Sequence, residues 1–449
     1  MQKQDSSSVP VVPEKARQGT EAPGRDWSWV EASVWTERML AALDKGVLGG
    51  KWFSLMDKVY RAGTLRAAWE RVARNQGAAG VDGQSVQRFA LGAPRYLEEL
   101  EQELKSGTYR AQPVKRVDIA KGPGKTRPLG IPVIRDRIVQ TALKMVIEPI
   151  FERQFRDHSY GFRPGRGCKD ALREVDGLIQ AGYTHVVDAD LAGYFESIPK
   201  AQMLQRVQGS ISDGAVLSLI KAFLEQDVLK GVERWKPASG TPQGAVISPL
   251  LANLYLHPLD CLLEQRGYRM VRYADDFVVM CASAQQAQAA LDEVRGWVAE
   301  HGLSLNADKT HVGDCTQAGE GFEFLGYRFE AGTRSVRRKS AAALREKIRA
   351  RTKRSRSGSL RTMLADLNPM LRGWFNYFQH ISAAAESFQR IDGFVRRRLR
   401  AILCRRNHRP HQFGRNLWAS KKWPNAFLAS QGLFTMVTAH AAASQSRCG

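Results

Sequence analysis

The chain has 449 residues, of which 67 are Lys or Arg and 45 are Asp or Glu, so its formal net charge is +22. This length allows two or three domains with cores of their own, and so large a basic excess indicates a polyanionic partner such as nucleic acid. No apolar run has the length of a membrane span, and the N-terminus resembles neither a secretory signal nor a transit peptide. The six cysteines form no C-x-x-C pair, which favours reduced thiols in a cytoplasmic protein.

Composition and periodicity change several times along the chain. Residues 1–26 are rich in Ser, Pro and Gln, so we expect a disordered tail. Apolar residues then recur at helical spacing up to about residue 68. Between about 100 and 330, helix and strand patterns are mixed, which predicts an α+β domain. After a Ser/Gly/Arg-rich joint at 351–360, a helical stripe of Leu367, Leu371, Trp374, Phe375 and Phe378 follows.

Two acidic stretches stand where buried strands are predicted to end. THVVDADLAGYFESI (184–198) predicts a strand that ends at Asp190 and leads into a helix, with Asp188 on the same face as an alternative ligand. In VRYADDFVVMC (271–281), Asp275 and Asp276 are adjacent, and only the tight turn of a hairpin lets both reach one cation. Adjacent carboxylates resist burial unless a divalent metal compensates their charge.

Three such carboxylates predict a site for two Mg²⁺ ions about 4 Å apart, as in in-line phosphoryl transfer. One ion would activate a hydroxyl nucleophile, and the other would stabilise the leaving pyrophosphate. The remaining oxygen ligands that a hard cation needs would come from neighbouring groups.

Basic residues are concentrated near the C-terminal end. Residues 331–410 contain 21 Lys and Arg against four Asp and Glu, with aromatic residues interleaved. This pattern favours a surface that binds a nucleic-acid phosphate backbone over a merely solvated helix face. The predicted RNA-binding residues are Arg396, Arg397, Arg398 and Arg400.

Several motifs strongly resemble those of reverse transcriptases encoded by group II introns. They are YADD (273–276), DADLAGYF (188–195), NQGAAGVDG (75–83), GKTRPLGIPVIRDRIVQTALK (124–144), SYGFRPGRGCKDAL (159–172), GTPQGAVISPLLANLYLHPLD (240–260) and LNPMLRGWFNYF (367–378). Ala245 stands where the family usually has a second Gly. The resemblance covers most of the chain and is highly specific as a set.

The resemblance implies a right-hand polymerase, with fingers and a palm whose antiparallel sheet carries the YADD hairpin, followed by an α-helical thumb or maturase domain. The expected segments are an N-terminal extension and the start of the fingers (27–100), fingers and palm (101–330), the helical domain (331–410) and a short C-terminal region without an endonuclease domain (411–449).

The resemblance also assigns roles to individual residues. It selects Asp190 over Asp188 as the metal ligand beside Asp275 and Asp276, with Leu191 next to it, and it makes Lys309 the candidate that protonates pyrophosphate. Phe195 would exclude a 2′-hydroxyl, and Tyr273 would pack beneath the primer end. The expected substrate-binding residues are Phe195, Gln243, Lys125, Arg127, Leu191 and Tyr273.

The function that follows is an RNA-directed DNA polymerase that binds its intron RNA, assists splicing and copies the intron into DNA. Its partners would be the intron RNA as template, a DNA or RNA primer, and deoxynucleotides, with no membrane. Two alternatives stay open. One is a related reverse transcriptase that acts in DNA repair or phage defence without an intron, and the other is a splicing cofactor with a vestigial polymerase.

Overall fold

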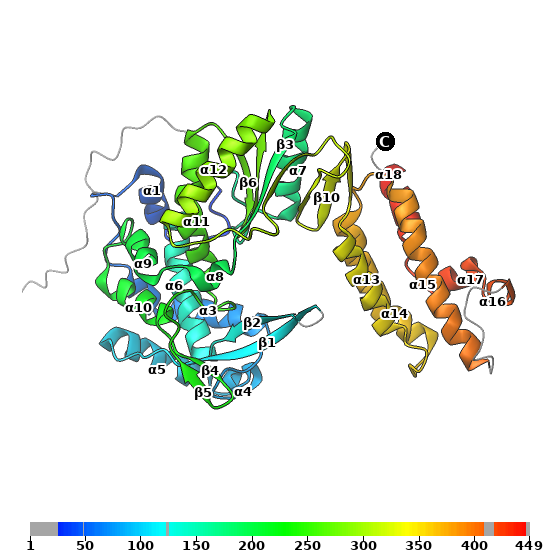
Figure 1. The fold of residues 1–449 in the computed structure, drawn as a ribbon. Helices are drawn as coiled ribbons and strands as arrows, with labels where there is room; N and C mark the ends of the chain where they lie inside the picture. Colours follow the sequence, from blue (N-terminus) through cyan, green and yellow to red (C-terminus); the bar gives the residue numbers. More distant parts are fainter. Residues whose placement is uncertain (1–25, 48, 123–124, 408–416, 446–449) are drawn as a thin grey trace, which may run out of the picture. The chain divides into compact units, whose positions relative to one another are not determined.

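The computed structural model describes residues 26–47, 49–122, 125–407 and 417–445. These residues form two compact units (Figure 1). The first consists of Met1–Glu174, Ala189–Phe277 and Ala289–Thr310, and the second of Val175–Asp188, Val278–Gln288 and His311–Gly449. The predicted disordered tail lies, except for Asp26, outside the described residues.

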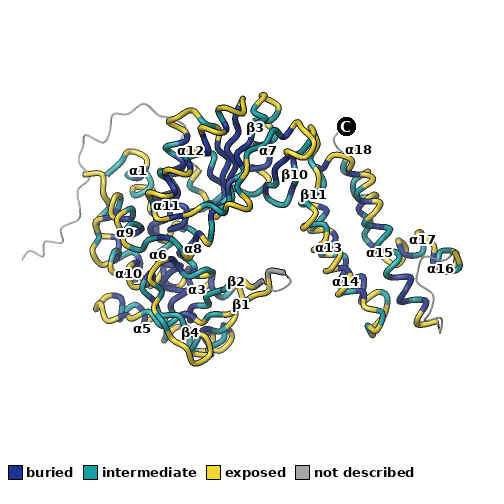
Figure 2. The backbone as a smooth tube through the Cα atoms, viewed as in Figure 1, coloured by how far each residue is buried: buried dark blue, intermediate teal, exposed yellow. Residues whose placement is uncertain are grey.

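The first unit is built around two helices whose residues are buried on nearly every side, polar ones such as Asp136 and Asn253 included. A helix of this kind is stable only when other elements cover it, and both α6 and α11 are largely buried (Figure 2). The helices of this unit are α1 (Glu37–Lys45), α2 (Met56–Val59), α3 (Ala62–Arg74), α4 (Val86–Ala90), α5 (Ala93–Ser106), α6 (Ile134–Glu152), α8 (Tyr194–Ser197), α9 (Lys200–Gln208), α10 (Gly214–Leu224) and α11 (Ser248–Gln265). The first three confirm the helical pattern predicted up to residue 68.

A four-stranded sheet in the first unit has the order β2-β1-β4-β5. Its strands are β1 (Val114–Gly122), β2 (Lys125–Ile131), β4 (Val228–Lys230) and β5 (Glu233–Trp235). The first two pair antiparallel as a hairpin, and β4 joins β1 in parallel.

A second sheet, of order β6-β7-β3-β8, carries the predicted acidic strands. Its strands are β3 (His185–Asp190), β6 (Arg269–Tyr273), β7 (Asp276–Cys281) and β8 (His311–Asp314). The predicted strand 185–190 and the predicted hairpin are both confirmed, and β3 and β7 are hydrogen-bonded neighbours. The boundary between the units passes through β3, β7 and two helices, α7 (Cys168–Gln180) and α12 (Ala284–Glu300).

The second unit combines a small sheet with long helices. Its remaining elements are β9 (Phe322–Phe324), β10 (Tyr327–Glu330), β11 (Thr333–Val336), α13 (Arg338–Arg351), α14 (Leu360–Phe378), α15 (Ala384–Arg406), α16 (Leu417–Lys422), α17 (Asn425–Ser430) and α18 (Met436–Gln445). Because β11 pairs with β10, the helices begin at Arg338 and not at the predicted residue 331. The α+β fold followed by a helical region is otherwise as predicted, and the stripe on α14 is buried except for the half-buried Trp374.

None of the described helices combines the length and the hydropathy that a membrane-spanning segment needs.

One buried carboxylate joins the core helix α6 to the segments that lead into β1 and β4. Asp136, in the first turn of α6, accepts hydrogen bonds from the Tyr109 hydroxyl (2.7 Å), the Gln112 backbone N–H (2.9 Å) and Gln226 Nε2 (2.9 Å). Burial raises the pKa of Asp136 to about 6, although the three donors act to lower it.

This raised pKa predicts a pH-dependent stability. A carboxyl whose folded pKa lies above its unfolded value binds more protons in the folded state, so its contribution to the free energy of unfolding falls as pH rises from about 4 to about 6. The fall should approach about 3 kcal/mol. Hydrogen exchange of the slowest α6 amides, compared between wild type and Asp136→Asn at pH 4 and pH 7, measures it. An identical pH dependence in both proteins would contradict the assignment.

Candidate active site

The hairpin turn presents the two adjacent aspartates. Ala274 and Asp275 form the link between β6 and β7, and Asp276 is the first residue of β7. Ala274 has φ 62°, in the left-handed region, and this local strain breaks the alternation that would otherwise send the two carboxylates to opposite faces. Asp276 is half-buried, whereas Ala274 before the pair is buried. The turn therefore places two carboxylates at one end of the hairpin, as the sequence predicts.

Asp190 ends the strand next to β7, and its backbone is fixed from the other side. The Asp190 carbonyl accepts from the Asn306 N–H (2.8 Å), and Leu191 forms an isolated bridge with Leu305. Leu191 is buried, and its apolar side chain offers no ligand atom. Only its backbone groups could therefore contribute to a metal or nucleotide site. The charge of Asp275 also acts on Tyr194, four residues beyond Asp190. Burial raises the pKa of that phenol well above its ordinary value, Arg272 lowers it, and Asp275 raises it further.

Lys309 lies directly on the Asp190 carboxylate. Its Nζ is 2.6 Å from Asp190 Oδ2, and the side chains are 57% and 38% exposed. An ion pair this exposed adds little to stability. It does place a positive charge at the predicted metal ligand and brings together two of the predicted catalytic residues.

Asp188 has different partners. Its Oδ2 accepts from the Glu323 N–H (3.4 Å) and lies 4.0 Å from His311 Nδ1, both within the second unit. This engagement gives Asp188 a structural role and leaves Asp190 as the carboxylate beside the hairpin.

The hairpin is held from behind by a fully buried arginine. Arg272, the residue before Tyr273, is 0% exposed and binds both carboxylate oxygens of Asp260, with Nε to Oδ1 at 2.7 Å. Its Nη1 donates to Asn253 Oδ1 and to the Ala274 carbonyl, each at 2.9 Å. Four of the five guanidinium N–H groups thus have acceptors, as a buried charged group requires. Arg272 thus ties the strained turn residue to α11.

The segment 158–161 completes this support. Asn253 Nδ2 donates to the Gly161 carbonyl (2.7 Å), the Tyr160 N–H donates to the Arg272 carbonyl, and the Arg272 N–H donates to the His158 carbonyl. A Cβ on Gly161 would lie 2.3 Å from the Ala274 nitrogen, so only glycine permits this approach. The sequence analysis missed this network. Its one available signal was the i, i+7 spacing of Asn253 and Asp260, two polar residues inside an apolar helix.

A second turn brings three predicted substrate-binding residues together. The Thr241 N–H donates to the carbonyl of Phe195 (2.8 Å), and Gly240, at φ 86°, leaves no room for a Cβ against α8. Gln243 Oε1 accepts from Arg127 Nε (2.7 Å), and its carbonyl accepts from the Gly130 N–H (2.6 Å). Phe195 is 7% exposed. The turn therefore connects α8 to β2; β2 begins at Lys125, whose side chain lies outside the described residues.

Tyr273 lies beside an aromatic residue that the sequence analysis overlooked. Its ring centroid is 6.5 Å from that of Phe162, which is half exposed at φ 59°. Burial, followed by a hydrogen bond with Cys168, raises the pKa of Tyr273 to about 12. Tyr273 is therefore a neutral hydrogen-bonding ring next to an exposed one, beside the aspartate turn.

The predicted RNA-binding arginines divide into two kinds. Arg400 is 8% exposed, and its guanidinium donates to the Trp423 carbonyl and to Asn425 Oδ1, each at 2.9 Å. The prediction of an RNA contact is wrong for Arg400, because its guanidinium fastens α15 to Trp423 and to the first residue of α17. Arg398 is largely engaged too, with Nη2 2.6 Å from the Thr352 carbonyl. Arg396 and Arg397 are half-buried and remain candidates.

The three aspartates suit a divalent cation by their chemistry. Among the described residues, no three Asp, Glu, His or Cys side chains already stand in a closed metal-binding group. Asp190, Asp275 and Asp276 nevertheless supply the hard oxygen donors that Mg²⁺ prefers, and Asp190 already binds a cation in the form of Lys309. By their chemistry these aspartates are therefore suited to hold Mg²⁺.

Comparisons with known proteins agree with this arrangement. The family model for reverse transcriptase (RNA-dependent DNA polymerase) matches residues 119–329, and that for the group II intron, maturase-specific domain matches residues 341–425. Protein YkfC of Escherichia coli (strain K12) is 36% identical over 290 residues, which cover 56% of this chain and 75% of YkfC.

Two further relatives match over shorter stretches. Group II intron-encoded protein LtrA of Lactococcus lactis subsp. cremoris is 41% identical over 170 residues, which are 38% of this chain and 28% of LtrA. The uncharacterized 91 kDa protein in cob intron of Schizosaccharomyces pombe is 38% identical over 168 residues, 37% of this chain and 21% of that protein. The chain thus spans less than a third of these two longer relatives.

The buried arginine yields a prediction. Arg272→Met removes one partner of a buried pair and leaves Asp260 charged and uncompensated, which should cost about 3–5 kcal/mol of stability. Arg266→Met is the matched control, because Arg266 pairs with Glu293 at the surface and should cost at most about 1 kcal/mol. Urea unfolding compares the two variants. Equal losses would show that Arg272 does not support the hairpin.

Proposed function

We propose a mechanism from the premise that the chain belongs to the reverse transcriptases encoded by group II introns, with a reverse transcriptase domain followed by a maturase-specific domain. It acts as an RNA-directed DNA polymerase that binds intron RNA, assists its splicing and copies it into DNA. The observation that carries the proposal is the strained hairpin turn bearing Asp275 and Asp276 on the strand next to Asp190.

The aspartates would hold two Mg²⁺ ions. When bound, these ions would lower the pKa of the primer 3′-hydroxyl and neutralise the charge that develops on the pyrophosphate. Lys309 Nζ lies 2.6 Å from Asp190 Oδ2, and from this place its ammonium could donate a proton to the leaving pyrophosphate.

The turn of residues 240–244 positions the incoming nucleotide. Gln243 and Arg127 are joined by a hydrogen bond, and the guanidinium keeps further N–H groups for triphosphate oxygens. Phe195 lies in α8 against this turn, where its ring would meet a 2′-hydroxyl. Leu191, through its backbone, and Tyr273, beneath the primer end, would complete the pocket, with Lys125 as a further basic residue of the fingers.

The basic second unit would bind RNA. Its helix α13 carries basic side chains along much of its length, namely Arg338, Lys339, Arg345, Lys347 and Arg349. Together with Arg396 and Arg397 on α15, these charges suit the phosphate backbone of a structured RNA, which is the partner a maturase requires.

The metal ligands give the first test. Asp190→Asn and Asp275→Asn should each slow primer extension on an RNA template by roughly a thousandfold or more, because a neutral amide cannot balance the metal charge. Asp188→Asn, two residues from Asp190, is the control and should extend primers at a near wild-type rate. Near wild-type extension by Asp190→Asn would refute the two-metal assignment.

Sugar selection gives the second test. Phe195→Ala should lower the preference for deoxynucleotides over ribonucleotides by about tenfold or more, because the ring no longer meets the 2′-hydroxyl. The ratio of the two kcat/KM values is the readout, since a buried Phe→Ala change also destabilises the fold and would slow both reactions together. An unchanged ratio would make Phe195 an ordinary core residue.

RNA binding gives the third test. Replacing Arg345, Arg396 and Arg397 with Gln should reduce the log–log salt slope of RNA affinity by about 0.7–0.9 for each phosphate that the variant no longer neutralises. The control removes equal charge from Lys221, Arg266 and Arg295, which are paired with Glu225, Glu293 and Asp292. If both triple variants show the wild-type slope, the RNA surface lies elsewhere.

A further inference from the structure

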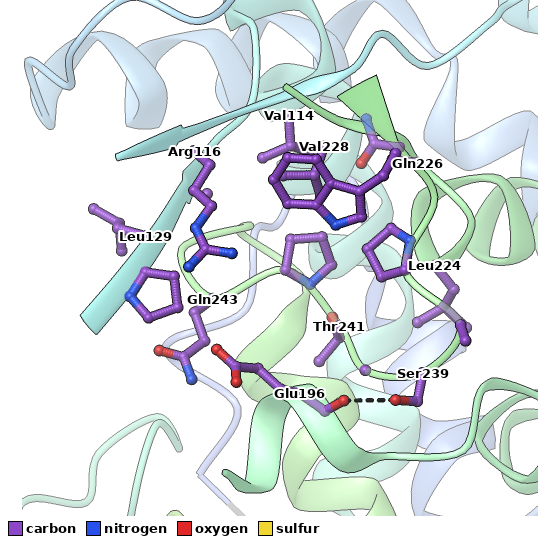
Figure 3. A pocket seen from close by; sticks show the side chains of 17 residues that line it. Val114, Arg116, Leu129, Glu196, Leu224, Gln226, Val228, Ser239, Thr241 and Gln243 are labelled. Atoms are coloured by element: carbon purple, nitrogen blue, oxygen red, sulfur yellow. Dashed lines mark hydrogen bonds between the residues drawn. The ribbon is translucent and has the colours of Figure 1, made fainter. Parts of the chain in front are cut away.

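A cavity of about 260 Å³ lies between the sheet β2-β1-β4-β5 and the turn that carries Gln243 (Figure 3). Every strand of the sheet lines it, and all of its lining residues belong to the first unit. The turn of residues 240–244, which positions the incoming nucleotide, forms one wall of this cavity, and no role has been given to the strand residues and Gln226 on its other walls. Its volume is below the roughly 300–1,000 Å³ of a drug-sized ligand pocket, which suits a single planar ring system.

The wall of this cavity contains a buried acceptor with nothing to bind. Gln226 is 5% exposed, and its Nε2 donates to the Gln112 carbonyl (2.7 Å) and to Asp136 Oδ2 (2.9 Å). Both partners are acceptors, so the amide cannot be flipped. Its Oε1 has no hydrogen-bond partner among the described atoms, and Figure 3 shows this oxygen on the cavity side of the side chain. A buried acceptor in this state favours a ligand that brings an N–H or O–H group.

The other lining residues define the rest of the ligand. Trp235, Pro237 and Pro242 offer flat apolar surfaces, and the Arg116 guanidinium lies 5.8 Å from the Trp235 ring centroid. An anion is disfavoured, because Arg116 is already paired with Asp118 at 3.0 Å and the Glu196 carboxylate lines the opposite side. The ligand is therefore a neutral, flat ring that carries an N–H donor. Nucleobases have these properties, and aromatic side chains bind them by stacking.

We propose that this cavity receives an unpaired base of the template strand, ahead of the base being copied. The proposal rests on the proposed polymerase function. The base being copied must keep its Watson–Crick edge free for the incoming nucleotide, whereas a base in this cavity would give its donor edge to Gln226. The two bases are therefore different. By holding a base beside Gln243, the cavity would set the register of the template before each addition.

The test combines a change in the protein with a change in the template. RNA templates carry a single abasic residue at each position of the 5′ overhang in turn, and affinity for the full chain is measured without nucleotide. At one position of the overhang, the abasic residue should lower the affinity of the wild type for the template by about 5- to 150-fold, the range expected for one base stack. With the intact template, the Trp235→Ala variant should bind more weakly than the wild type by the same factor. An abasic residue at the sensitive position should not weaken the binding of this variant any further. Trp235→Phe should retain most of the affinity.

The control variant is Val232→Ser, in the turn between β4 and β5, where Val232 is fully exposed. It should bind every template as the wild type does. The proposal is overturned if no overhang position is sensitive, or if the losses from Trp235→Ala and the abasic residue simply add. Because these experiments measure binding, such a result would leave the proposed polymerase function intact. Failure of the polymerase proposal would instead appear as undiminished primer extension by Asp190→Asn.

Discussion

A charged guanidinium without solvent must find every partner inside the protein, and at Arg272 this requirement determines the geometry of the active site. Asp260 balances the charge, while Asn253 and the Ala274 carbonyl accept from the two N–H groups of Nη1. A buried donor without an acceptor costs free energy, so a hairpin position that broke any of these contacts would be destabilised. The strained Ala274 is thereby held in place, and Asp275 and Asp276 acquire a fixed direction.

Close backbone packing reinforces the same site in two places. At Gly161 the segment 158–161 presses against the turn of the hairpin, and at Gly240 the nucleotide-binding turn presses against α8. Neither contact tolerates a Cβ, so both segments are positioned by backbone rather than by side chains. The site thus consists of flexible functional groups, Lys309 among them, on a scaffold with little freedom. This division suits a polymerase, which must move one template step per addition without disturbing its metal ligands.

The sequence was sufficient where a feature is local. The strand that ends at Asp190 and the hairpin around Asp275 follow from short-range patterns, and the sheet places β3 beside β7 as expected. It was insufficient where polar partners come from distant segments. Arg400 belongs to a basic run, yet it faces Trp423 and Asn425, because charge density does not reveal which face of a helix is covered. Likewise, nothing in the sequence around Gln226 predicts that its Nε2 donates to Asp136 or that its buried Oε1 has no partner among the described residues.

We propose that Asp190 and the hairpin aspartates together hold two metal ions. Electron paramagnetic resonance with Mn²⁺ in place of Mg²⁺ tests it most directly, on the full chain bound to primer, template and an unreactive nucleotide. Two magnetically coupled Mn²⁺ ions per chain, about 4 Å apart, are expected, and the coupling should be lost in Asp276→Asn. A single isolated Mn²⁺, or coupling that survives this substitution, would contradict it.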